Sequence, residues 1–86
     1  MQIFDKHPEA VKDYGFDYTD WLDGDTIDTS TWTVSGADKI SESHTTTKTT
    51  VWVGGGRARE AKLRNVIETA GGRTEVRTIL LRIRET

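Results

Sequence analysis

The residues able to take part in catalysis are few in this chain of 86 residues. A hydrolase or transferase needs a nucleophile beside a base, a pair of carboxylates in a cleft, or a metal ion. Cysteine is absent, which excludes thiolate nucleophiles, disulfides and thiolate metal sites together. The serines have only His7 and His44 as candidate bases, and both histidines stand in polar segments. We therefore expect no catalytic residues and no enzymatic activity.

A cluster of acidic residues is the candidate metal site. Carboxylates suit calcium and magnesium, but the spacing of this cluster differs from that of an EF-hand loop. Aspartate also favours turns, so we interpret the cluster as turn-forming and solubilising, with a bound cation as the alternative. We predict no metal and no cofactor. The cluster consists of Asp17, Asp20, Asp23, Asp25 and Asp28.

Four aromatic residues in the first quarter of the chain are the candidate protein-binding residues: Tyr14, Phe16, Tyr18 and Trp21. Acidic residues stand among them, and a rigid aromatic side chain flanked by acids can anchor a protein contact. Trp32 and Trp52 lie instead in segments with a β pattern, so we expect both in the core.

Charge is divided unevenly along the sequence. Residues 1–43 hold three lysines and ten acidic residues (net −7), whereas residues 44–86 hold nine basic and four acidic residues (net +5). The two halves either pair within one domain or make a head-to-tail contact between copies. Because the aromatics lie mainly in the acidic half, we expect no nucleic-acid contact. No apolar run approaches the roughly 20 residues of a membrane span, so we expect no membrane contact.

The length predicts one domain, because two hydrophobic cores in 86 residues would each be too small to be stable. Hydrophobic residues make up 34% of the chain, so the core is thin. Small domains without disulfides or metals often gain stability by oligomerising or docking. We expect an N-terminal arm at residues 1–15, with a short helical turn at residues 8–12, followed by a β-sandwich domain at residues 16–86.

Most of the chain after residue 25 is rich in β-branched and aromatic residues, which predicts strands at residues 26–34, 39–43 and 45–53. Turn residues separate these strands at 23–25, 35–38 and 54–56. Ile27 and Trp32 differ in parity, which implies a bulge or bend between them.

Residues 73–84, close to the C-terminal end, form the clearest strand pattern. Its alternation places Ile79, Leu81 and Ile83 inward, with Thr78 outward. We also assign the arginines of this strand, Arg77, Arg82 and Arg84, to its outward face, where they would protect an exposed edge.

Residues 57–70 fit two secondary structures. Helix-forming residues, helical spacing of Leu63, Val66 and Ile67, and a following Gly71-Gly72 favour a helix. The same residues also alternate, which would make them the first strand of a hairpin with residues 73–84. Local pattern alone leaves both possible.

The order and spacing of several local patterns resemble a group of short tailed-bacteriophage virion proteins, the fibre-tail adaptor or head-decoration-like proteins. The patterns are Tyr14-Gly15-Phe16-Asp17-Tyr18-Thr19-Asp20-Trp21-Leu22, Gly24-Asp25-Thr26-Ile27, Ser30-Thr31-Trp32-Thr33-Val34, Thr50-Val51-Trp52-Val53-Gly54-Gly55 and Asn65-Val66-Ile67-Glu68-Thr69-Ala70-Gly71-Gly72-Arg73-Thr74-Glu75. None of them is a catalytic signature. The charged stretch at residues 57–62 departs from the family pattern, which usually has small and hydroxyl residues there.

The resemblance implies an all-β fold, a small immunoglobulin-like antiparallel β-sandwich, with residues 60–69 as a strand. It implies a non-catalytic virion protein, made in the host cytoplasm, that binds tail, fibre or capsid subunits in several copies around a symmetric assembly. The expected function is that of a fibre-tail adaptor. A capsid decoration protein is the first alternative, and a carbohydrate-binding β-sandwich is an alternative of another class.

Overall fold

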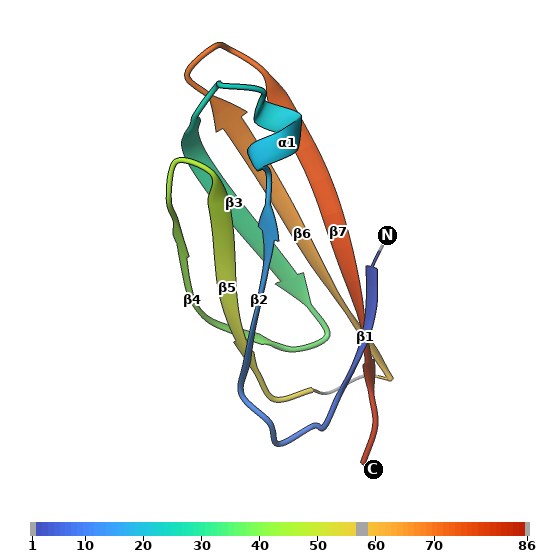
Figure 1. Cartoon of the computed structure of the whole chain (residues 1–86). Coiled ribbons are helices and arrows are strands. Elements are labelled where there is room, and N and C mark those ends of the chain that lie inside the picture. The colour runs from blue at the N-terminus through green and yellow to red at the C-terminus, as the bar shows by residue number, and fades with distance from the viewer. Residues whose placement is uncertain (1, 57–58, 86) are drawn as a thin grey trace.

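Two β-sheets packed face to face make up the structure, a computed structural model that describes residues 2–56 and 59–85 (Figure 1). One sheet has the strand order β1-β7-β6-β3 and the other β2-β5-β4. All pairs are antiparallel except β1 with β7, which is parallel. The elements are β1 (Gln2–Lys6), β2 (Lys12–Asp17), α1 (Thr19–Leu22), β3 (Ile27–Ser35), β4 (Asp38–His44), β5 (Lys48–Gly54), β6 (Glu60–Thr69) and β7 (Thr74–Ile83). The predicted all-β, immunoglobulin-like sandwich is confirmed.

The core lies between the sheets and is built by alternation along each strand. On β5, Thr49, Val51 and Val53 are buried, whereas the residues between them face outward. The sandwich is narrow and long, with principal extents of 42, 21 and 15 Å. The largest fully buried apolar side chains come from both sheets and from α1: Trp32, Tyr18, Leu22, Leu63, Ile67, Ile79, Leu81, Val51 and Val53.

Residues 60–69 form strand β6, so the hairpin prediction is confirmed and the helix prediction is wrong for them. β6 pairs with β3 on one side and with β7 on the other over most of its length. In that place Ala61, Leu63, Asn65 and Ile67 are all buried on one face. A helix would turn these alternating residues to different sides and would leave the backbone groups of β3 and β7 that face β6 without partners. Residues 57–58 of the same prediction lie outside the described residues.

The N-terminal residues enter both sheets. β1 lies alongside the lower half of β7 in Figure 1, with Gln2 opposite Ile79 and Lys6 opposite Ile83. Residues 12–15 begin β2, which pairs with β5. The expected helical turn at residues 8–12 is instead a single tight turn, in which Ala10 N–H donates to His7 C=O at 3.1 Å. Whether residues 1–15 act as a separable arm stays a prediction.

A buried lysine fastens β1 to the rest of the molecule. The Lys6 side chain is 1% exposed, and its Nζ donates to the carbonyl of His7 at 2.9 Å and to the carbonyl of Gly55. Burial lowers the pKa of Lys6, since taking an ammonium out of water disfavours its charged form. The carbonyl contacts satisfy two of its three donors and tie β1 to the connection that leaves β5.

Two further features that the sequence predicted, a bulge in β3 and a turn before it, are present in the structure. The register shifts between Ile27 and Thr29, which confirms the predicted bulge. The turn at Asp23-Gly24 is also confirmed, with φ angles of 49° and 91° in the left-handed region. The four-residue helix α1 before that turn was not predicted. Among the described residues no helix is long and apolar enough to cross a membrane.

A polar network crosses the core at Asn65. Its Oδ1 accepts hydrogen bonds from Tyr18 Oη at 2.9 Å and from Thr49 Oγ1 at 3.0 Å, both on the side of the three-stranded sheet. Its Nδ2 donates to Ser30 Oγ at 3.0 Å and to Thr31 C=O at 3.3 Å on β3. A fully buried amide thus finds partners in both sheets, which is how buried polar groups are tolerated.

We expect Asn65→Ala to lower the free energy of unfolding by about 3–5 kcal/mol, because it removes four hydrogen bonds and leaves buried hydroxyls without a partner. Chemical denaturation measures this loss. The control is Arg64→Ala, an exposed neighbour on the same strand, for which we expect a change within about 0.5 kcal/mol. Equal losses in the two variants would show that the network does not hold the sheets together.

Candidate functional site

The four predicted protein-binding residues lie along the seam between β2 and β7. Phe16 and Tyr18 are buried in the core, at 9% and 0% exposure, whereas Tyr14 and Trp21 are half-buried. Their rings form a series of contacts, with Phe16 stacked on Trp32 at 5.6 Å and Tyr18 against Trp21 at 6.1 Å. Burial leaves Phe16 and Tyr18 little surface for a partner. The contact role of all four residues stays a prediction.

Arginines from β7 and the turn before it cover these rings. The Arg77 guanidinium lies 4.5 Å from the centre of the Tyr18 ring and 6.0 Å from that of Phe16. Arg73 lies 4.3 Å from the centre of the Trp21 ring. Such cation–π contacts are favourable, and the arginine stems cover apolar surface as well.

The outward assignment of Arg77 is therefore wrong. Arg77 shares the parity of Ile79 and Leu81, and this signal in the sequence would have placed it on the inner face. Its guanidinium also lies 3.7 Å from the Glu75 carboxylate, two residues along the same strand. Arg82 is exposed as predicted.

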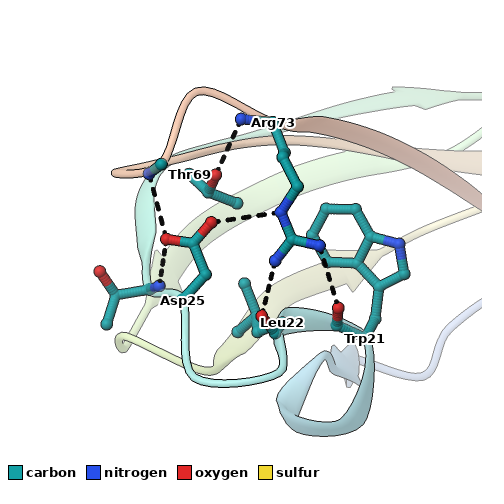
Figure 2. Close-up of polar contacts among 7 residues, drawn as sticks. Trp21, Leu22, Asp25, Thr69 and Arg73 are labelled. Atoms are coloured by element: carbon teal, nitrogen blue, oxygen red, sulfur yellow. Dashed lines mark hydrogen bonds and ion pairs between the residues drawn. The ribbon is translucent and has the colours of Figure 1, made fainter.

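A polar cluster closes the end of the sandwich at α1 (Figure 2). Arg73 donates from Nε to Asp25 Oδ2 at 3.3 Å, from Nη1 to the Trp21 carbonyl at 3.3 Å, and from Nη2 to the Leu22 carbonyl at 2.6 Å. The backbone N–H of Arg73 donates to Thr69 Oγ1 at 2.9 Å. One arginine thus holds the C-terminal end of α1 against the β6–β7 turn.

Asp25 is the acceptor at the centre of this cluster. Its Oδ1 accepts from the backbone N–H of Thr26 at 2.8 Å and from that of Gly71 at 3.1 Å. Hydrogen bonds from the Thr69 side chain, these backbone groups and Arg73 hold the pKa of Asp25 below its ordinary value. A Cβ at Gly71 would lie 2.7 Å from Asp25 Oδ2, so a side chain there would displace the Asp25 carboxylate.

The aspartates of the candidate metal site do not gather around one point. Asp25 belongs to the cluster just described, and Asp17 accepts from Thr19 N–H at 3.0 Å and from Thr19 Oγ1 at 2.5 Å. These hydrogen bonds lower the pKa of Asp17. Over residues 2–56 and 59–85, no three histidine or carboxylate side chains come close enough to hold a metal ion.

An apolar cluster lies on the outer face of the three-stranded sheet. Val11, Ile40 and Trp52 are 57%, 56% and 42% exposed. A Cβ at Gly54 would lie 2.9 Å from Ile40 Cδ1 and 3.5 Å from Val11 Cγ2, so these two side chains meet above that glycine. Trp52 lies two residues before Gly54 on the same face of β5. We call this group the Trp52 cluster.

The core prediction is confirmed for Trp32, which is 1% exposed, and is wrong for Trp52. Strict alternation on β5 buries Thr49, Val51 and Val53, so Trp52 must face the other way. The β pattern indicated a strand correctly, but a strand has two faces, and the sequence did not show that only one is covered.

Comparison with known families gives one match. The family model described as podophage GP4 fiber-tail adaptor protein gp77 matches residues 6–82, from the end of β1 almost to the end of β7. No curated protein matches the sequence. The matched range includes both the polar cluster around Asp25 and the Trp52 cluster.

We expect Asp25→Asn to destabilise the protein at neutral pH and to lose this effect in acid. Because the pKa of Asp25 in the folded state lies below the ordinary 3.8, the ionised carboxylate stabilises the folded protein above pH 3.8. This stabilisation is lost as the pH falls through the folded-state pKa. Denaturation of wild type and variant from pH 7 to pH 2 measures the difference. Asp28→Asn, at an exposed position on β3, is the control and should match wild type at neutral pH. A difference that stays constant down to pH 2 would contradict the assignment.

The contribution of Tyr18 to folding stability also depends on pH, but it is lost at high pH rather than at low pH. Burial raises its pKa to about 12 from an ordinary 10.0, so the neutral phenol stabilises the folded state below pH 10 and this gain is lost as pH rises through 12. We expect the stability difference between wild type and Tyr18→Phe to be constant up to pH 10 and to shrink above it. The other titrating groups are shared by both proteins and cancel. A constant difference through pH 12 would show that Tyr18 is not shielded from water.

Proposed function

The chain belongs to the family of the podophage GP4 fiber-tail adaptor protein gp77, and from this premise we propose that it joins tail to fibre by protein contacts alone. The family is a structural one, and the resemblance found in the sequence is thereby confirmed. The protein is accordingly a phage structural protein of the tail. What it attaches to, and by which surface, is our proposal.

The Trp52 cluster is the observation that carries the proposed attachment surface. Monomeric soluble domains seldom expose large apolar side chains next to one another, and such groups mark protein interfaces. The cross-strand neighbours of Trp52 are Asp13 on β2 and Ser41 on β4, so polar residues border an apolar centre. An aromatic residue in an apolar centre with a polar rim is the usual arrangement of an interface hot spot.

The shape of the domain supports a spacer role. The sandwich is about twice as long as it is wide, and the buried network at Asn65 joins its sheets. A domain of this kind transmits force between two attached components without a change of shape. We propose that several copies act around a symmetric assembly in the virion, bound to other virion proteins.

A catalytic role has no support from either histidine. His7 Nδ1 accepts a hydrogen bond from the Glu9 backbone N–H at 3.0 Å, which is a turn-stabilising contact. His44 is exposed at the end of β4. We propose that the protein works without catalysis.

Labelling of purified particles with an antibody to this chain, followed by electron microscopy, tests the location. We expect label at the junction of tail and fibres and a few dozen copies or fewer per particle. Label over the whole head, with copy numbers in the hundreds, would identify a decoration protein instead. Micromolar binding on a glycan array would favour the carbohydrate-binding alternative, to which a single exposed Trp52 gives little support.

We expect Trp52→Ser to reduce incorporation into particles about tenfold or more, since hot-spot aromatics commonly contribute 2 kcal/mol or more to binding. Quantitative immunoblotting of purified particles measures incorporation. Thermal unfolding should change little, because the side chain lies outside the core. Lys48→Ser on the same strand is the control, for which we expect wild-type incorporation. Wild-type incorporation of Trp52→Ser would exclude the Trp52 cluster as the attachment surface.

A further inference from the structure

Half of strand β7 has a free edge. β7 runs from Thr74 to Ile83, and β6 pairs with it from Thr74 to Arg82. On its other side, β1 pairs only with residues 79–83. Within residues 2–56 and 59–85, residues 74–78 therefore have a strand on one side and none on the other, as the upper part of β7 in Figure 1 shows.

The backbone groups at this free edge belong to the even-numbered residues. Ile83 N–H donates to the Arg59 carbonyl on the β6 side, whereas Arg84 N–H donates to the Lys6 carbonyl on the β1 side. Backbone groups alternate in direction along a strand, so those of Thr74, Val76 and Thr78 face away from β6. In agreement, Val76 N–H donates to the Glu75 carboxylate at 3.2 Å rather than to a strand.

At the opposite edge of the same sheet, side chains of β4 cover backbone groups of β3. At Trp32 on β3, the backbone N–H donates to Glu42 Oε2 at 2.9 Å, and the backbone carbonyl accepts from Lys39 Nζ at 3.1 Å. Two side chains of β4 thus occupy the position that a further strand would take. Native proteins protect sheet edges in this way, and the described residues place no comparable cover from another element over Thr74–Thr78.

The sequence of the free edge, Thr74-Glu75-Val76-Arg77-Thr78, is complementary to itself in the antiparallel direction. If two copies pair about Val76, each Glu75 stands opposite Arg77 of the other copy, and each Thr74 stands opposite Thr78. Directly opposed residues of unlike charge stabilise an antiparallel pair. A pairing of this kind has two-fold symmetry and presents the same residues from both copies.

Inward-directed charges usually protect an edge, because an added strand would leave them without a partner. Glu75 and Arg77 are of this kind and lie on the inner face of β7 at the seam with β2, where Arg77 covers Tyr18. Their order makes the protection selective. A second copy in antiparallel register gives each of these residues a further neighbour of opposite charge. A copy shifted by two residues would place like charges opposite one another, and an unrelated apolar strand would add no charged neighbour to the existing Glu75–Arg77 contact.

The outer face and the length of the edge fit the same pairing. Val76 is 43% exposed and lies opposite Val66 of β6. With a two-fold axis at Val76, the Val66–Val76 pair of one copy would lie next to the same pair of the other copy, and the four valines would form one apolar row across the joined sheets. An open hollow of about 410 Å³ lies at this edge, lined by residues that include Phe16, Arg77 and Thr78. Gln2, opposite Ile79, limits the site to five residues.

We propose that two copies of this protein associate through residues 74–78 of β7, in antiparallel register about Val76, so that their four-stranded sheets join into one continuous sheet. The backbone groups of Thr74, Val76 and Thr78 form the ladder between copies. The opposed Glu75 and Arg77 side chains set its register and exclude other strands. The proposal concerns contact between copies and does not depend on what the adaptor joins in the virion.

A charge exchange tests it with the purified full chain. Sedimentation equilibrium should show the wild type in a monomer–dimer equilibrium, at concentrations up to about 1 mM because an interface of this size is weak. Glu75→Arg and Arg77→Glu each place like charges opposite one another, and each should weaken dimerisation at least tenfold. An equimolar mixture of the two variants restores both opposed pairs and should form dimers again.

Two further variants keep the test decisive if Arg77→Glu fails to fold. Asp28→Arg, exposed on β3 at the opposite edge of the same sheet, is the matched control and should dimerise as wild type does. Val76→Cys, the single thiol in its chain, should form a disulfide-linked dimer on mild oxidation, whereas Thr31→Cys on β3 should not. A wild type that stays monomeric over the whole range, or dimers unaffected by Glu75→Arg, would overturn the proposal.

Discussion

The two sheets of the sandwich meet at the side-chain amide of Asn65, which binds residues of both within a thin core. A core of this size has few large side chains, so apolar packing alone gives the sheets little reason to prefer one position over another. A buried amide is different, because each of its hydrogen bonds has a direction and leaving one unmade is costly. Tyr18, Thr49 and Ser30 must therefore come to fixed places, and with them the strands that carry them.

The position of Tyr18 has consequences at the surface. Its ring lies beneath the Arg77 guanidinium and against Trp21 of α1, so the buried network reaches the seam through one aromatic side chain. Trp21 in turn lies beneath Arg73, which holds α1 and Asp25 against the β6–β7 turn. The end of the sandwich is thus fixed by aromatic and arginine contacts. Of the aromatics predicted as docking residues, Phe16 and Tyr18 are buried in this arrangement, and the docking role stays a prediction.

The two surfaces that we propose for protein contacts consist of exposed side chains and backbone groups that take no part in the core. Alternation on β5 buries Val51 and Val53 and turns Trp52 outward, onto the face that also carries Val11 and Ile40. Among the described residues, β1 pairs only with residues 79–83 of β7, and residues 74–78 have no strand on that side. One surface is apolar and broad, and the other is a narrow edge with paired charges. The first surface carries our proposed contact to other virion proteins, and the second carries our proposed contact between two copies.

The sequence by itself determined the features that depend on neighbouring residues. Period-two alternation identified the strand at 73–84, turn-forming residues placed the bends at Asp23-Gly24 and at residues 35–38, and the parity of Ile27 and Trp32 predicted the bulge. The joint pattern of motifs also identified the family. Tertiary structure decided whatever depends on residues far apart. Residues 60–69 are a strand because β3 and β7 supply their hydrogen bonds, against a local preference for helix. Trp32 is buried and Trp52 exposed because only one face of each sheet is covered, and Asp25 meets Arg73 across 48 residues of chain. Local rules fix what a segment tends to form; which of its faces is buried, and against what, is fixed only when the sheets pack.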